Sequence, residues 1–137
     1  MKTVYDLMAA TATALAGKPV TVRLQAPSTK GNHGECHAGP DGRLILDIHP
    51  GLDESQTLLV VCHEAAHARL HRFAPSTVYR AAPGTLAPNA NTLGERVRET
   101  QAETLANEWI EYGRKHADPT LGDLEGPLWA LLDYYRR

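Results

Sequence analysis

The sequence predicts an α+β fold: a single domain over residues 1–137, with a short mixed sheet packed against two helices. Three observations predict it. Apolar and polar residues alternate in the segment 20–24, and the largely apolar segment 43–48, which follows a strong turn signal, is the clearest strand in the chain. The segments 54–71 and 94–116 have the length and the apolar faces of helices. Hydrophobic residues make up 42% of the chain, enough for a packed core without disulfides.

The N-terminal half predicts a helix followed by strands. Leu7, Met8 and Leu15 fit an amphipathic helix that ends at Gly17, and Pro19 prevents its continuation. The elements expected after this helix are a strand at 20–24, a polar loop at 27–34, a short strand at 35–38, a turn at 39–42 and a strand at 43–48.

The C-terminal half predicts three helices and one long irregular stretch. The first helix covers residues 54–71 and the second covers 94–116. Between them, residues 73–93 are rich in proline and show no sustained period, which indicates either a lid or substrate loop or a surface insertion. Residues 127–136 form an amphipathic pattern, and we expect this last helix to pack on the core.

The most informative segment is 63–67, which reads H-E-A-A-H. Histidines four residues apart lie on the same face of a helix, about one turn apart, so both imidazoles can reach one zinc ion. Glu64 between them is placed to act as a base on a metal-bound water. The preceding run, residues 57–62, is apolar and predicts a buried setting. The alternative, two solvated histidines with an ion-paired glutamate, fits that setting less well.

A catalytic zinc ion needs a third protein ligand and one open position. A histidine ten residues after the first is one common solution, but Phe73 occupies that position. A glutamate from the second long helix is the other solution. Glu99 and Glu103 lie on one face of it, and the small side chains of Ala102 and Ala106 would let this helix approach closely. The spacing permits either carboxylate to be the ligand.

The sequence E-T-L-A-N-E-W at 103–109 resembles the signature that follows H-E-x-x-H in the ImmA/IrrE-like zinc metallopeptidases. The segment 98–106 is also similar to the matching helix of ArdC-type antirestriction domains, and the resemblance covers about residues 43–109. It implies a zincin-like domain of the gluzincin kind with one Zn²⁺ per chain. The roles implied are zinc ligands for His63, His67 and Glu103, and a catalytic base for Glu64.

The function implied by this resemblance is hydrolysis of a peptide bond in a protein substrate, such as a repressor or regulatory partner of a bacterium, phage or mobile element. The alternative is a non-catalytic zinc-containing binding protein of the anti-restriction or anti-repressor type. We expect an extended substrate along an edge strand. The net charge of -2, without a dense block of Lys or Arg, argues against a nucleic-acid partner.

The same composition bears on where the protein acts. No segment approaches the length of a membrane span. Two cysteines are too few for a disulfide scaffold, so we expect reduced thiols and a cytoplasmic location.

Three further polar residues have open roles. His71 follows His67 by four residues, so it could hydrogen-bond an outer group of the site or stabilise an oxyanion. More often a histidine in this position simply ends the helix, where its charge suits the dipole. Tyr79 and Tyr112 are possible transition-state donors, and the spacing selects neither.

Overall fold

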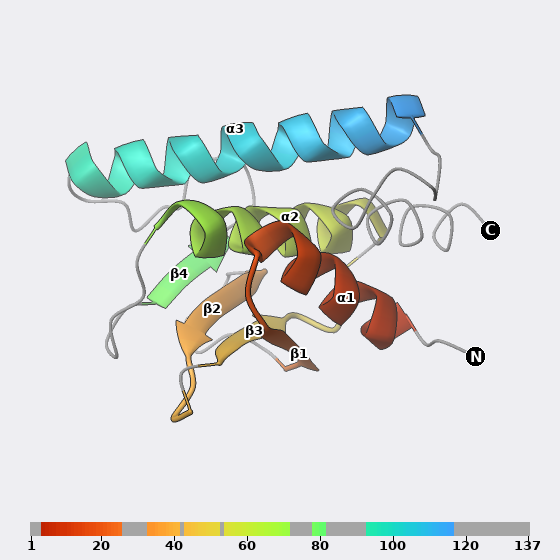
Figure 1. The fold of residues 1–137 in the computed structure, drawn as a ribbon, viewed down its shortest axis with the longest axis vertical. Helices are drawn as coiled ribbons and strands as arrows, with labels where there is room; N and C mark the ends of the chain where they lie inside the picture. Colours follow the sequence, from red (N-terminus) through yellow and green to blue (C-terminus); the bar gives the residue numbers. More distant parts are fainter. Residues whose placement is uncertain are drawn as a thin grey trace.

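The computed structural model describes residues 4–25, 33–41, 43–52, 54–71, 78–81 and 93–116. These residues form three helices and one four-stranded sheet, so the fold is α+β as predicted (Figure 1). The elements in chain order are α1 (Val4–Ala16), β1 (Val20–Leu24), β2 (Gly34–Ala38), β3 (Leu44–Ile48), α2 (Glu54–Leu70), β4 (Val78–Ala81) and α3 (Leu93–His116).

The sheet is mixed, with the strand order β1-β3-β2-β4. β1 is parallel to β3, whereas β2 is antiparallel to both β3 and β4. The first three strands lie within one residue of the expected ranges. β4 corrects the sequence-based expectation, because Val78–Ala81 falls inside the stretch 73–93 that was expected to be irregular. Most of that stretch, and the helix expected at 127–136, lie outside the described residues.

α2 is the central layer of the fold. α1 and α2 pack on one face of the sheet, and α3 runs antiparallel to α2 on the side away from the sheet (Figure 1). Among the described elements, α3 contacts α2 alone. Residues 57–68 of α2 are therefore almost all buried, which explains their continuous apolar run. Neither α2 nor any other described helix combines the length and apolarity needed to cross a membrane.

Small residues set how closely these layers approach. Gly17 has a φ of 75°, and its amide donates to the Thr13 carbonyl at 3.0 Å, which ends α1 in the expected way. A Cβ at Gly34 would collide with the side chain of Val60, so glycine is what lets β2 approach α2. On α3, Ala102 and Ala106 are both fully buried against α2. The two helices can therefore place short polar side chains in direct contact.

Candidate metal centre

α2 and α3 bring together two histidines and a glutamate that could hold a metal ion. One ligand atom from each of His63, His67 and Glu99 lies within 4.8 Å of the others, and all three residues are buried. Oε2 of Glu99 is 2.9 Å from Nε2 of His63, and Oε1 is 3.2 Å from Nε2 of His67. The Glu99 carboxylate therefore faces the same ring nitrogen of both histidines. These three residues are called the triad below.

Glu103 lies on the opposite side of the His63 ring. Its Oε2 is 2.9 Å from Nδ1 of His63, and Nδ2 of Asn107 donates to the Glu103 carbonyl at 2.9 Å. The sequence resemblance implied Glu103 as the third ligand, whereas the set of residues that could hold a metal ion contains Glu99. The physical reason is the path of α3 across α2: one further helical turn carries a side chain past Nε2 to the other edge of the imidazole. Glu99, one turn earlier on α3, is therefore the glutamate that faces Nε2 of His63.

Glu64 lies beside the triad and is not a member of it. Its side chain is fully buried, and its Oε1 is 4.0 Å from Nε2 of His63. α2 thus places a second carboxylate near Nε2 of His63, the ring nitrogen that Glu99 also faces. Carboxylate oxygens and imidazole nitrogens gathered in this way are ligands that suit a divalent metal ion.

The two histidines differ in their electrostatics. Burial lowers the pKa of His67 to about 4, so its ring is neutral at physiological pH. Burial also opposes charge on His63, but the hydrogen bonds with Glu103 and Glu99 outweigh it and raise the pKa of His63 to about 10. Burial alone would raise the pKa of Glu99, yet His63 and His67 beside its carboxylate lower that pKa to about 2.

An unsatisfied nitrogen supports metal binding at this site. Nε2 of His67 is buried and makes no hydrogen bond within the described part of the chain, because its approach to Glu99 at 3.2 Å is not aligned for one. Buried polar atoms without a hydrogen bond are rare and call for a missing partner. A neutral imidazole whose lone pair points at a carboxylate is the donor arrangement that a divalent metal ion satisfies. The residues present therefore fit a metal ion.

Further side chains surround His67. The ring of Tyr79, from β4, stacks on it with the centroids 4.0 Å apart and the planes 11° from parallel. Nδ1 of His71 lies 3.0 Å from Nδ1 of His67, and Nε2 of His71 lies 2.9 Å from Oε1 of Gln101. The sequence raised His71 and Tyr79 without assigning them a role, and it gave no signal for Gln101. The side chain of Tyr112 lies outside the described residues.

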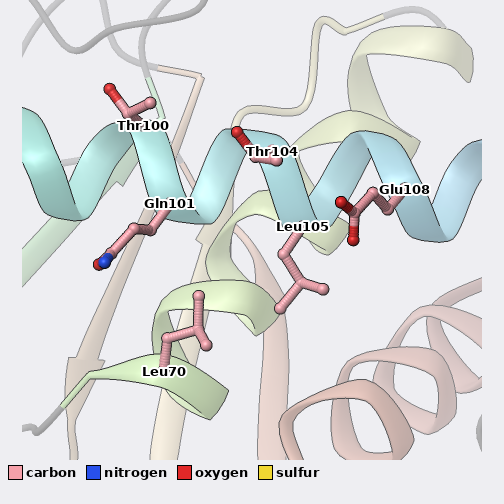
Figure 2. Close-up of a pocket in the computed structure, with 6 residues that line it drawn as sticks. All are labelled: Leu70, Thr100, Gln101, Thr104, Leu105 and Glu108. Atoms are coloured by element: carbon pink, nitrogen blue, oxygen red, sulfur yellow. The ribbon is translucent and has the colours of Figure 1, made fainter.

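A separate shallow groove lies between the C-terminal end of α2 and the middle of α3 (Figure 2). The described residues that line it are Leu70, Thr100, Gln101, Thr104, Leu105 and Glu108. No member of the triad is among them. Figure 2 shows Gln101 projecting from α3 toward the end of α2 that carries Leu70.

Comparisons of the chain with models of protein families, with curated proteins and with solved structures found no match. The chemistry of the site follows instead from its residues. Two imidazole nitrogens and one carboxylate form a set that could hold a metal ion, with a further buried carboxylate, Glu64, next to it.

Proposed function

We propose that the protein is a zinc-dependent metallopeptidase that hydrolyses a peptide bond of a protein substrate. The position of Glu64 carries this proposal. Its fully buried carboxylate lies 4.0 Å from Nε2 of His63, beside the triad and outside it. A metal site that only stabilised the fold has no need of a further carboxylate beside its ligands. A general base next to a metal ion requires such a group.

The triad supplies a zinc ligand set of the catalytic type. In this proposal His63 and His67 would hold zinc through Nε2, and Glu99 would hold it through its carboxylate. Three protein ligands of these types are typical of catalytic zinc sites, whereas purely structural zinc sites usually have four. Glu103 accepts a hydrogen bond from Nδ1 of His63, which orients the ring toward the metal. The role of third zinc ligand, which the sequence resemblance implied for Glu103, is given to Glu99 in this proposal.

The reaction then divides between the metal ion and one side chain. Zinc, when bound, acts as a Lewis acid that polarises the scissile carbonyl and makes water acidic enough to attack near neutral pH. Glu64 takes the proton from the attacking water and passes it to the leaving amine. The low exposure of the triad also limits access of competing water.

The position of β4 favours an extended peptide as the substrate. β4 is at the edge of the described sheet and pairs with β2 on one side. Its Tyr79 stacks on His67, so this edge runs directly beside the triad. An added peptide strand gains main-chain hydrogen bonds along such an edge whatever its sequence. We infer a protein segment as substrate, and a repressor or other regulatory protein is the substrate class that the sequence resemblance suggests.

The first test is metal content followed by cleavage. Elemental analysis of the purified protein should give about one zinc per chain, and His63→Ala should lower this toward zero because a ligand is lost. His49→Ala, which removes an exposed histidine, is the matched control and should retain zinc. The zinc-loaded protein should cleave members of a proteome-derived peptide library, and a chelator should stop the cleavage.

Two outcomes of this test would contradict the proposal. Equal zinc content in wild type and His63→Ala would show that the triad is not the metal site. Zinc at the triad without chelator-sensitive cleavage of the library or of lysate proteins would favour the non-catalytic binding protein instead.

A further inference from the structure

His71 links a member of the triad to the surface of α3. It follows directly after α2, and its amide donates to the carbonyl of His67 at 2.8 Å, which continues the helical turn and fixes its position. Nδ1 of His71 then lies 3.0 Å from Nδ1 of His67. On the other side of the ring, Nε2 of His71 lies 2.9 Å from Oε1 of Gln101. Gln101 is exposed and lines the groove between α2 and α3 (Figure 2).

The protons in this series of hydrogen bonds, from Gln101 through His71 to His67, can be placed by starting from the acceptor oxygen of Gln101. An amide oxygen only accepts, so Oε1 of Gln101 takes a hydrogen bond from the Nε2–H of His71. A His71 ring that carries its one proton on Nε2 accepts at Nδ1. In this arrangement the hydrogen bond between the two rings is donated by the Nδ1–H of His67. With its proton on Nδ1, His67 presents the lone pair of Nε2 toward Glu99.

The two histidines of the triad thus have different hydrogen-bond partners at Nδ1. Nδ1 of His63 faces the carboxylate of Glu103, whereas Nδ1 of His67 faces a second histidine that is itself hydrogen-bonded to Gln101. Without an acceptor behind it, the proton of His67 could move to Nε2 and occupy the position that the metal requires. Partners of this kind fix the tautomer and the ring orientation of metal-binding histidines.

We propose that His71, held by Gln101, is a positioning residue that keeps His67 in the tautomer able to bind zinc. The inference rests on the zinc site proposed above. It differs from the simpler role of a histidine at a helix end, in which a positive charge near the last turn stabilises α2 through its dipole. The two roles need different atoms, since positioning needs an acceptor at Nδ1 and the dipole needs only a positive charge.

The test measures the zinc affinity of purified full-length variants by competition with a chromophoric chelator. His71→Ala should weaken zinc binding about 10- to 100-fold, the range typical of an outer-shell partner. His71→Asn places an amide oxygen near the position of Nδ1 and should restore most of the affinity. His71→Lys places a positive charge at the helix end without an acceptor and should bind zinc as weakly as His71→Ala. Thermal unfolding of each variant checks that the fold is kept.

The outcomes separate this inference from the zinc site itself. Wild-type affinity in His71→Ala would overturn the positioning role and leave the zinc site intact. Rescue by lysine and not by asparagine would also overturn it, in favour of the dipole. Absence of zinc binding by the wild-type protein would overturn the zinc site and this inference together. Gln101→Ala should weaken zinc binding less than His71→Ala, because it removes the hydrogen bond between Gln101 and His71 and leaves the one between His71 and His67.

Discussion

Glu64→Gln is expected to lower peptide hydrolysis about 100- to 10,000-fold, the usual contribution of a positioned acid or base. Glutamine keeps the shape of the side chain but cannot take a proton from water. Zinc should remain bound, because Glu64 lies beside the triad and is not one of its members. The measurement is the rate of cleavage of a library-derived peptide, together with zinc content and thermal unfolding of the same preparation.

A control separates loss of the base from a general effect of the substitution. Glu108→Gln makes the same chemical change at an exposed position on α3, outside the triad, and should leave cleavage and zinc content unchanged. Cleavage by Glu64→Gln within a few-fold of wild type would show that another group serves as the base. Loss of zinc from Glu64→Gln would instead place Glu64 among the ligands.

The second large effect is expected at Glu99. Glu99→Gln replaces an ionised ligand by a neutral amide and should weaken zinc binding by more than about 100-fold, beyond the range typical of outer-shell partners. Glu103→Gln should weaken it less, about 10- to 100-fold, because it removes only the negative charge from the group that accepts the His63 Nδ1 hydrogen bond. A chelator competition titration ranks the two variants directly.

The two variants form a matched pair, since the same change is made one helical turn apart. Equal or greater damage from Glu103→Gln would return the third ligand to the position implied by the resemblance. It would also mean that α3 crosses α2 in a different register when zinc is bound. Retention of wild-type zinc affinity in both variants would remove α3 from the site altogether.

Local pattern was sufficient for most of the fold. Alternation of apolar and polar residues located β1, and the apolar run after the turn at 39–42 located β3. Gly17 marked the end of α1, because its left-handed backbone suits glycine. β4 was missed for a physical reason: Val78–Ala81 is four residues long, and its place in the sheet depends on pairing with distant β2. Short edge strands carry little pattern of their own.

The site was predictable in its composition and less so in its geometry. The spacing of His63 and His67 placed both rings on one face of α2, which the triad confirms. The spacing of Glu99 and Glu103 placed both carboxylates on one face of α3, but periodicity carries no information about where two helices cross. That crossing decides which carboxylate meets Nε2. It also brings Gln101 to His71, a contact between residues thirty positions apart that no local motif marks.

The most direct measurement for the zinc site is an anomalous difference map from crystals of the zinc-loaded protein, recorded on both sides of the zinc absorption edge. We predict one peak per chain, about 2.0 to 2.2 Å from Nε2 of His63, Nε2 of His67 and a carboxylate oxygen of Glu99. Glu64 and Glu103 should lie outside the coordination sphere. A map without a peak at the triad, or with zinc held by Glu103 in place of Glu99, would contradict this account.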